Sequence, residues 1–171
     1  MNEVSIATEN DIKDLNELIN SAYRGEGSKK GWTTEADILD GIRTDDESLK
    51  NIIHRKNTFL LKYTDDKKIT ACVLLEKQGD ALYLGMLTVS PELQGKGVGK
   101  VLLNSAEEKA KELLCKKIKM TVISVREELI KWYERHGYSD TGKREPFPME
   151  DPKFGLPKQQ LEFIVMEKRV N

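Results

Sequence analysis

The sequence predicts a mixed α/β domain in which helices flank one mostly antiparallel central sheet. Segments of alternating or continuous apolar residues, typical of strands, interleave with segments whose apolar residues recur at helical spacing. The strand-like segments in the middle of the chain are joined by turns too short for crossover helices, so we expect them to pair antiparallel. No repeat or linker divides the 171 residues, which predicts a single domain over residues 1–171.

The N-terminal segment predicts a strand followed by a helix. Residues 3–7, EVSIA, form a short run typical of a strand. Thr8, with Asp11 three residues later, has the residue types and spacing of a helix N-cap. Apolar residues then recur every three or four positions over residues 12–22, which predicts an amphipathic first helix.

A loop and a second helix are expected next. Glycines and charged residues fill residues 24–31, RGEGSKKG, and predict a loop. We expect the second helix to begin near Thr34, with Asp37 as its capping partner, and to continue through residues 35–44.

Three strand-like segments follow and predict antiparallel pairing. A turn of two aspartates and two lysines joins the first two segments, and the next turn contains Gly79. The three segments are residues 58–64, 68–76 and 81–89.

The C-terminal half alternates helices and strands. Gly137 follows the second predicted helix of this half, at a position where glycine commonly ends a helix. A long, proline-bearing connection over residues 144–158 separates the last two strands, and such loops are often functional. The expected elements are a helix over 98–114, a strand over 117–124, a helix over 126–136, and strands over 138–143 and 160–168.

Composition excludes several classes of protein. The 28 basic and 29 acidic residues give a net charge of −1, and aromatic residues make up 6%, so we expect no nucleic-acid partner. No apolar run approaches the roughly 18 residues of a membrane span, and the N-terminus lacks the features of a signal peptide. Cys72 and Cys115 lie far apart and are expected to be reduced thiols. We therefore expect a soluble, cytoplasmic protein without a membrane partner.

Three glycines within residues 95–99 separate a strand-like segment from a helix-like one. A Walker A loop would need glycine in place of Gln94 and a serine or threonine in place of Val101. A Rossmann fingerprint starting at the first of these glycines would need a small residue in place of Lys100, and a strand outside an antiparallel hairpin. Neither nucleotide-binding motif fits the turn.

The glycine turn favours an anion site over a turn that only lets the helix pack closely on the sheet. Successive N–H groups converge at a helix N-terminus, and the helix dipole adds positive potential there. The strand–turn–helix context and the lysine at the helix start are typical of such a site. Close packing stays the alternative.

Residues 94–99, QGKGVG, match the Q/R-x-x-G-x-G/A motif of the GNAT family of N-acetyltransferases. Residues 131–138, KWYERHGY, resemble the family's Y-x-x-x-G-F/Y segment, and the predicted element order follows the family over nearly the whole chain. The resemblance implies the GNAT (acyl-CoA N-acyltransferase) fold and acetyl-CoA as the acyl donor.

The resemblance also implies how coenzyme A would bind. Backbone amides of the turn would bind its pyrophosphate, and the preceding strand would pair with the pantetheine arm through its main chain. The coenzyme-binding residues implied are Leu87, Thr88, Val89, Gln94, Gly95, Lys96, Gly97, Val98, Gly99 and Lys100.

Amide formation from a thioester needs a neutral amine, a donor to the developing oxyanion and an acid for the leaving thiolate. We expect the backbone N–H of Leu87 to polarise the acetyl carbonyl. Tyr133 matches the family tyrosine whose hydroxyl lies near the coenzyme sulfur, which makes it the expected general acid. Its spacing from Leu129 and Ile130 alone favours a core aromatic instead.

The sequence defines the general base less closely. Glu76 ends the strand beside that of Leu87, and burial there would raise the pKa of its carboxyl; a solvated glutamate is the alternative. Tyr83 could instead hold a water in a proton wire, or be a cross-strand aromatic. His136 is expected at a helix C-terminus, which suits a positive imidazole, and His54 at the surface. No cluster has metal-ligand spacing, so we expect no metal.

One position departs from the family pattern. Arg126 stands where the family often has an asparagine that contacts the coenzyme. An arginine could reach a phosphate or cap the helix, so no asparagine role is carried over.

In this fold the first two helices, their loop and the loop before the last strand enclose the acceptor groove. Trp32 is expected as a groove wall or lid anchor, or packed under its loop, and Phe147 as a rigid wall opposite. Charged residues of the first segment could pair with a charged acceptor or stay solvated: Arg24, Glu26, Glu35 and Arg43. The expected substrate-binding residues are Trp32, Arg24 and Phe147.

The sequence therefore predicts an N-acetyltransferase that moves acetyl from acetyl-CoA to a primary amine of a small polar molecule by direct attack in a ternary complex. A non-catalytic acyl-CoA sensor of the same fold is the alternative, and it would turn over no amine. A nucleotide-binding regulator is a weaker one, which predicts affinity for ATP or GTP with magnesium. Homodimers are common in such folds, although no segment of this sequence indicates one.

Overall fold

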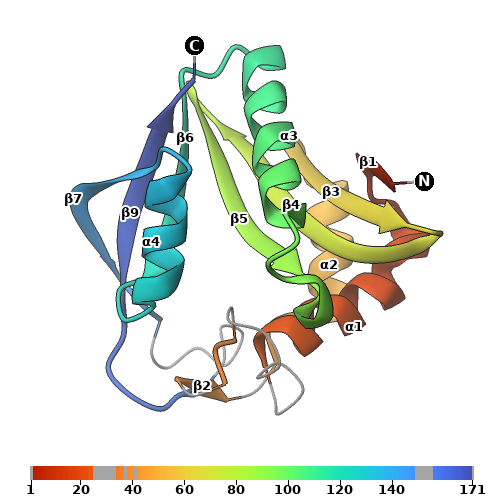
Figure 1. The fold of residues 1–171 in the computed structure, drawn as a ribbon, viewed down its shortest axis with the longest axis horizontal. Coiled ribbons are helices and arrows are strands. Elements are labelled where there is room, and N and C mark those ends of the chain that lie inside the picture. The colour runs from red at the N-terminus through yellow and green to blue at the C-terminus, as the bar shows by residue number, and fades with distance from the viewer. Residues whose placement is uncertain (1, 25–33, 37, 41, 149–155, 171) are drawn as a thin grey trace.

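The computed structural model shows one seven-stranded sheet between two groups of helices (Figure 1). It describes residues 2–24, 34–36, 38–40, 42–148 and 156–170. No helix within these residues is long and apolar enough to cross a membrane. The strand order is β1-β3-β4-β5-β6-β9-β7, and β5–β6 is the parallel pair. The strands are β1 (Asn2–Ile6), β3 (Thr58–Asp65), β4 (Lys68–Gln78), β5 (Ala81–Val89), β6 (Lys117–Ile123), β7 (Ser139–Pro146) and β9 (Glu162–Arg169).

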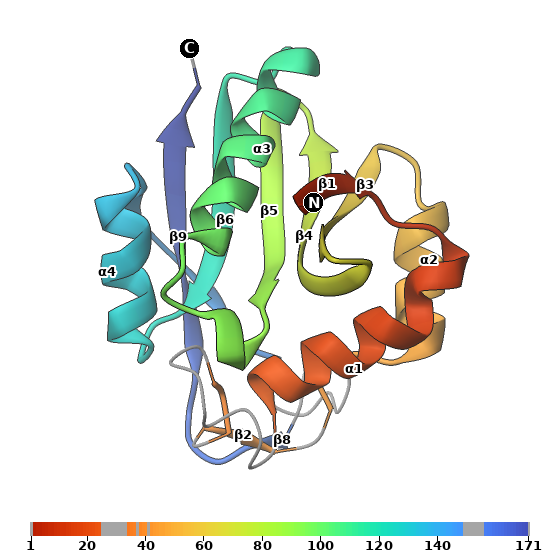
Figure 2. The ribbon, with the colours of Figure 1, turned by 45° about the vertical axis from the view of Figure 1, so that its right-hand side comes forward.

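The helices cover both faces of the sheet (Figure 2). One group packs through α1 and α2, and the other through α3 and α4. Neighbouring strand residues face opposite groups: Leu60 packs with α1 and α2, whereas Leu61 packs with α3. The helices are α1 (Ile12–Tyr23), α2 (Asp46–His54), α3 (Val98–Glu112) and α4 (Glu127–Arg135), with short 3₁₀ turns η1 (Glu9–Asp11) and η3 (Pro91–Leu93).

The apolar periodicity of α1 and α3 places fully buried side chains in the two cores. Leu15 and Ile19 of α1 are 0% exposed, as are Leu102 and Ala106 of α3. Burying one such leucine contributes about 1.5–3 kcal/mol to folding. Thr8 caps the 3₁₀ turn η1, which leads directly into α1, and its N–H donates to the Asp11 carboxylate at 2.8 Å; the N-cap residue of α1 itself is Asp11.

The second helix lies later than predicted. The expectation of a helix over residues 35–44 is wrong, because α2 begins after Asp45. The Asp45 carboxylate accepts a hydrogen bond from the Ser48 N–H at 2.8 Å, which satisfies one of the free donors of the first turn. Leu49 then anchors the helix in the core, with 0% exposure.

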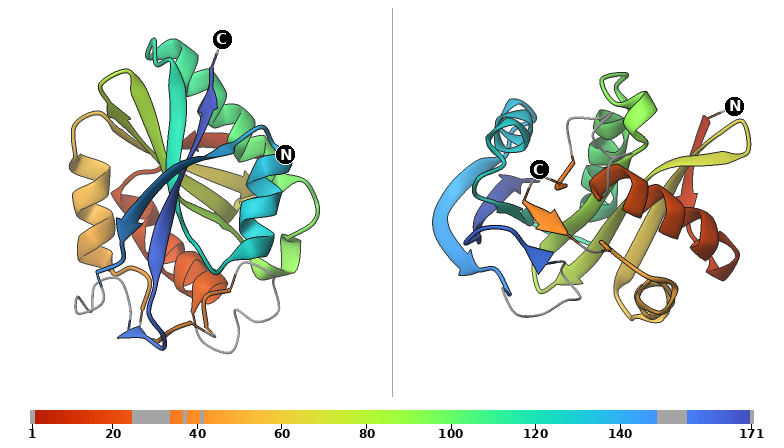
Figure 3. Two further views of the ribbon diagram at one scale, coloured as in Figure 1. Left: turned by 90° about the vertical axis from the view of Figure 1, so that its left-hand side faces the viewer. Right: turned by 90° about the horizontal axis from the view of Figure 1, so that it is seen from below.

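A short antiparallel sheet occupies the segment where that helix was expected. β2 (Leu39–Asp40) pairs with β8 (Leu156–Pro157), at the end of the domain where β5 and β6 separate (Figure 3). The Thr34 hydroxyl accepts from the Ala36 N–H at 3.1 Å and so forms a local turn, and Asp37 lies outside the described residues. The expected irregular connection over 144–158 is also shorter, because β7 continues to Pro146.

The sheet opens into a V between β5 and β6, visible in Figure 1. These strands pair only over Ala81–Tyr83 and Lys117–Lys119. β6 stays paired with β9 as far as Ile123, whereas its pairing with β5 ends at Lys119. Beyond Tyr83, the edge of β5 that faces β6 has no strand partner among the described residues.

A β-bulge distorts β5 at the same level. Gly85 pairs with Leu74 of β4, and the next pairing on β5 is that of Thr88 with Cys72. β5 thus contains one extra residue, and Met86 takes a positive φ of +51°. Bulges commonly redirect the main chain beside functional sites.

Candidate active site

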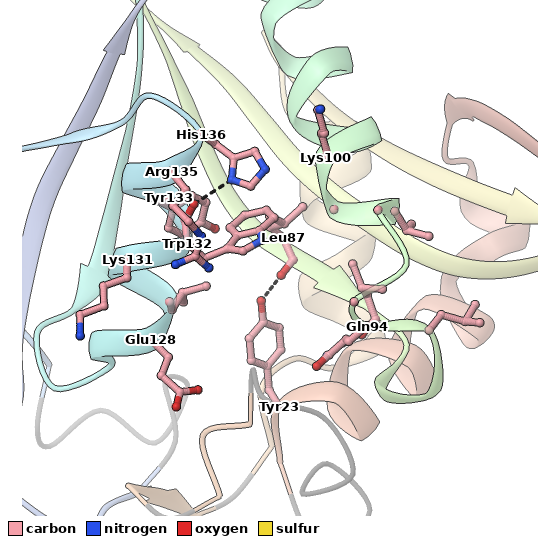
Figure 4. Close-up of a pocket in the computed structure, with 17 residues that line it drawn as sticks. Tyr23, Leu87, Gln94, Lys100, Glu128, Lys131, Trp132, Tyr133, Arg135 and His136 are labelled. Atoms are coloured by element: carbon pink, nitrogen blue, oxygen red, sulfur yellow. Dashed lines mark hydrogen bonds between the residues drawn. The ribbon is translucent and has the colours of Figure 1, made fainter.

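A cavity of about 520 Å³ lies between the end of β5 and α4 (Figure 4). One wall is the end of β5 with the glycine turn and the start of α3, and the other wall is the face of α4 that carries Trp132 and Tyr133. This volume is within the range of cofactor and small-molecule sites. The cavity therefore has the place and size expected of the coenzyme site.

Gly95 and Gly97 shape the turn. Their φ angles are +85° and +84°, a region that strongly favours glycine, and a Cβ added at either would meet nothing within 4 Å. Gly97 is the N-cap of α3, and no side chain among the described residues caps that end. The N–H groups of Val98, Gly99 and Lys100 therefore lack partners within the helix. These three residues line the cavity, so amides without a helical partner lie beside it, which supports the anion-site interpretation.

Gly99 has a packing role. A Cβ at Gly99 would stand 3.0 Å from the Trp132 ring, which is tighter than most real Cβ contacts and would require the ring to shift. Its absence lets the first turn of α3 pack against α4. The close-packing alternative thus accounts for Gly99, but not for Gly95 and Gly97.

The polar residues of the turn differ in their positions. The Gln94 side-chain amide donates to the Val89 carbonyl at 3.0 Å, which ties the turn to the end of β5. Gln94 and Lys100 both line the cavity, and Lys100 adds a positive charge at its rim. Lys96 is exposed and does not line it.

The side chains of the three expected coenzyme-binding residues of β5 point alternately toward the cavity and away from it. Leu87 and Val89 line the cavity. Thr88 is 1% exposed and lies outside it, and its hydroxyl donates to the Met86 carbonyl at 2.9 Å. Thr88 therefore stabilises the bulge, and it pairs with Cys72 on the edge of β5 that faces β4.

Tyr133 lies deep in the site. It is 5% exposed, and its ring makes edge contacts with Trp132 and Tyr138. Burial raises the pKa of its hydroxyl well above the usual tyrosine value, so this group is protonated at every physiological pH. No hydrogen bond joins that hydroxyl to the residues that the structure describes. The hydroxyl is therefore a protonated donor beside the larger cavity, as a general acid must be, although the raised pKa makes it a weaker acid than an exposed tyrosine.

Tyr23, at the end of α1, is a site residue that the sequence analysis missed. Its hydroxyl donates a hydrogen bond to the Leu87 carbonyl across the base of the cavity (Figure 4). Burial raises the pKa of this hydroxyl too, which keeps it a donor. Its helical spacing with Ile19 and Ala22 marks it only as a core residue, so no local signal identifies the contact.

A second cavity of about 150 Å³ continues on the other side of Tyr23 and Leu87. Phe147 lines it and packs against Phe163, with ring centroids 5.2 Å apart. The same cavity is lined by Arg24, so the structure brings together these two expected substrate-binding residues. The third, Trp32, lies outside the described residues.

A buried charge cluster forms one wall of this second cavity. The Glu35 carboxylate accepts from Arg24 at 2.8 Å and from Arg126 at 3.3 Å. Arg126 is the N-cap residue of α4 but makes no side-chain capping bond there. This arginine thus faces the second cavity and a carboxylate, and the helix-capping role is not seen.

The structure does not support Glu76 as the general base. Its carboxylate accepts hydrogen bonds from Gln78, Arg55 and Thr58, and it lines neither cavity. The hydrogen bond from Gln78, with that from Arg55, lowers the pKa of this carboxyl. The expected rise in pKa is therefore wrong, because the strand end is polar rather than apolar.

The other candidate acid–base residues lie in three different places: the second cavity, the first cavity and the protein surface. The Tyr83 hydroxyl lies 3.3 Å from the Thr121 hydroxyl in the lining of the second cavity. His136 lines the first cavity, and its Nδ1 lies 2.7 Å from the Trp132 carbonyl. His54 is exposed beside Glu9, as expected. Within the described residues, no three His, Cys, Asp or Glu side chains are placed to hold a metal ion.

Comparison with known proteins gives a family and a fold. The sequence profile of the acetyltransferase (GNAT) domain matches residues 22–147. No curated protein sequence matches the chain closely enough to be called a relative.

Solved structures similar to this one include several N-acetyltransferases. The ribosomal-protein-S18-alanine N-acetyltransferase of Escherichia coli superposes with a TM-score of 0.73 at 14% identity, covering 100% of this chain and 95% of its own. PaiA N-acetyltransferase of Thermoplasma acidophilum, in complex with coenzyme A, gives 0.70 at 19% identity and 99% coverage of both chains. The ribosomal-protein-alanine N-acetyltransferase of Brucella melitensis gives 0.72 at 20% identity, covering 98% and 99%. At these identities the likeness concerns the fold.

Proposed function

The chain belongs to the GNAT family and is an acetyl-CoA-dependent N-acetyltransferase, and on this premise we propose that it acetylates a primary amine of a small polar molecule by direct attack in a ternary complex. The proposal also assigns the larger cavity to the coenzyme and the smaller one to the acceptor.

The meeting of the two cavities is the observation that carries the proposal. Tyr23, Leu87, Leu129 and Tyr133 line both of them. An acyl group at the inner end of one cavity would therefore lie next to an amine at the inner end of the other. Such an arrangement supports direct transfer, because no acylated enzyme residue is needed to carry the group between two sites.

The size of the second cavity supports a small acceptor. Its volume of about 150 Å³ is below the roughly 300 Å³ at which drug-sized pockets begin. Phe147 gives it an apolar wall and Arg24 a charged one. A small polar amine fits both the volume and this mixed lining.

The residues of the larger cavity fit coenzyme A. The free amides at the start of α3 would bind the pyrophosphate, and the positive end of the helix dipole adds to that attraction. Leu87 and Val89 offer their N–H groups on an edge that has no strand partner among the described residues, which suits pairing with the amides of the pantetheine arm. Their carbonyls already accept from Tyr23 and Gln94.

When bound, acetyl-CoA supplies a thioester carbonyl. The amine nitrogen forms a bond to the acetyl carbon while the carbon–sulfur bond breaks; the amine loses one proton and the departing thiolate gains one. The Leu87 N–H would stabilise the negative charge that develops on the acetyl oxygen. Tyr133 would donate the proton to the thiolate and regain one from solvent.

The acceptor amine would reach the site without a dedicated base. Glu35 is the carboxylate in the described lining of the second cavity, and two arginines hold it. We therefore propose that the amine binds neutral, or loses its proton to water, and that the fraction of neutral amine limits the rate at low pH.

The first test compares ligands by thermal shift and then measures turnover. Acetyl-CoA and coenzyme A should each stabilise the protein, by about 2.7 kcal/mol at 100 times Kd, whereas ATP with magnesium and NAD should not. A panel of small amines is then assayed by release of free coenzyme thiol. Intersecting double-reciprocal lines are expected for a ternary complex. Parallel lines would contradict direct attack, and absence of turnover with every small amine would contradict the acceptor class.

A further inference from the structure

Leu87 lies at a point where the described strands give β5 no regular pairing on either side. On the side of β4, the register passes from Gly85 to Thr88, so Leu87 falls within the bulge. On the side of β6, the pairing of β5 ends at Tyr83. Main chain outside a ladder is more mobile than main chain within one, unless other groups hold it. The residue whose N–H is proposed to stabilise the acetyl oxygen therefore needs another source of rigidity.

Two side-chain hydroxyls form hydrogen bonds to the peptide groups on both sides of the Leu87 Cα. The Thr88 hydroxyl donates to the Met86 carbonyl at 2.9 Å, and that carbonyl belongs to the same peptide group as the Leu87 N–H. The Tyr23 hydroxyl donates to the Leu87 carbonyl, which belongs to the following peptide group (Figure 4). Because peptide groups are planar, the two bonds together orient both planes and the N–H that lies between them.

For Leu87, Tyr23 replaces half of the contact that a neighbouring strand would make. In an antiparallel ladder, a hydrogen-bonded residue directs its N–H and its C=O at the same neighbour, which bonds to both. Here a side chain of α1 takes the carbonyl, whereas no strand of the described chain pairs with the N–H on that edge. A hydroxyl that gives its proton to this carbonyl cannot at the same time protonate the thiolate. The role of Tyr23 therefore differs from that of Tyr133.

Tyr23 is itself held in place by its surroundings. It is 7% exposed, and its ring lies beside the guanidinium groups of Arg43 and Arg126, whose central carbons are 5.5 and 5.8 Å from the ring centroid. Its main-chain carbonyl accepts from the Glu35 N–H at 2.8 Å, where α1 ends. Contacts at the ring, the hydroxyl and the main chain thus limit the movement of this side chain, so it can fix the position of Leu87.

We propose that Tyr23 is a positioning residue for the oxyanion donor, and that its hydroxyl holds Leu87 with the N–H directed at the acetyl oxygen of bound acetyl-CoA. This inference rests on the proposed function, which places the acetyl oxygen at that N–H. A donor oriented before the reaction needs no rearrangement as charge develops, and a misplacement of about 1 Å can cost about 100-fold in rate. Tyr23 therefore contributes to kcat through Leu87.

The first test measures the polarisation of the acetyl carbonyl without any acceptor. Acetyl-CoA labelled with a heavy isotope at the carbonyl carbon is bound to the whole protein, and subtraction of the unlabelled spectrum isolates the infrared stretch of that carbonyl. A hydrogen bond to the oxygen weakens the C=O bond and lowers the stretching frequency. We expect the band of acetyl-CoA to lie lower on the wild type than in solution, and Tyr23→Phe to move it back toward the solution value.

Turnover gives the second measurement. Tyr23→Phe removes the hydroxyl and keeps the ring, so coenzyme and acceptor should bind as before. We expect kcat to fall about 10-fold or more, with Kd for acetyl-CoA and KM for the amine little changed. Tyr63→Phe is the matched control, because Tyr63 is 8% exposed, lies in β3 and lines neither cavity. Neither the carbonyl band nor kcat should change in that variant.

The outcomes separate this inference from the proposed function. If Tyr23→Phe keeps the wild-type band and the wild-type kcat, the inference is overturned and the proposed function stands, even where Tm falls, because the bond then only stabilises the fold. A band that does not shift when acetyl-CoA binds the wild type would overturn the Leu87 N–H as oxyanion donor, and the inference with it. If every small amine fails but Tyr23→Phe moves the band, the acceptor class is wrong and the inference is supported.

Discussion

The conformation of the glycine turn allows coenzyme binding to be separated from folding in one substitution. Gly97 and Gly142 have nearly the same φ, +84° and +86°, and a Cβ at either would meet nothing within 4 Å. Gly97 lines the larger cavity, whereas Gly142 lies in β7 and lines neither cavity. Gly97→Ala and Gly142→Ala therefore impose a similar backbone strain and differ in what the added methyl faces.

The expected magnitudes follow from that geometry. An alanine in the left-handed region costs roughly 1–2 kcal/mol, so both variants should lose about 2–8 °C in Tm without ligand. For coenzyme A at 100 times the wild-type Kd, the wild type and Gly142→Ala should gain about 2.7 kcal/mol. A methyl that obstructs the phosphate in Gly97→Ala should weaken binding at least tenfold and cut that gain to about 1.4 kcal/mol or less.

Thermal unfolding of the three proteins, with and without coenzyme A, measures all of these quantities. A titration at fixed temperature gives Kd independently of the unfolding data. Equal coenzyme shifts for Gly97→Ala and Gly142→Ala would refute the reasoning, since the turn would then be a packing device only.

Three further predictions concern the chemical step. Tyr133→Phe should lower kcat by roughly 100-fold with the coenzyme shift unchanged, and an unaltered kcat in steady-state assays would remove the general-acid role. Thr88→Val should lower kcat about 2–10-fold, because the Met86 carbonyl that accepts from Thr88 shares a peptide group with the Leu87 N–H; Thr88→Ser should restore the rate, and equal rates for the two variants would contradict this coupling. The rate should rise about tenfold per pH unit below the pKa of the acceptor amine and should not fall up to about pH 10, because the raised pKa of Tyr133 keeps it protonated; a falling limb near neutral pH in the pH–rate profile would contradict that protonation state.

Local patterns were sufficient for most elements of the fold. The strand predicted over residues 81–89 has those bounds in the structure, and the glycine turn has the strand–turn–helix context that the sequence indicated. Both depend on neighbours within a few residues. The second helix was misplaced for the same kind of reason: Thr34 and Asp37 have capping-box spacing, but Asp45 forms the real cap three residues before Ser48.

The centre of the site depends on contacts that local patterns do not contain. The bond from Tyr23 to Leu87 spans 64 residues, and that from Arg126 to Glu35 spans 91. Spacing within α4 accordingly suggested only a helix cap or a phosphate contact for Arg126. The prediction of Glu76 as the general base failed because its surroundings were misjudged. The end of its strand was predicted to be apolar, but in the folded chain the Glu76 carboxylate accepts hydrogen bonds from Arg55 and Gln78.

The separation of β5 and β6 has a consequence for the stability of the folded protein. The sheet has two parts, one made of β6, β9 and β7 and the other made of the remaining strands. Three residue pairs between β5 and β6, at one end, are the only strand pairing between the two parts among the described residues. A coenzyme that pairs with the edge of β5 and contacts α4 would connect the two parts of the sheet where they are not paired with each other. Coenzyme binding should then raise the free energy of unfolding, and amide exchange in β6 and β9 should slow most when coenzyme A is bound.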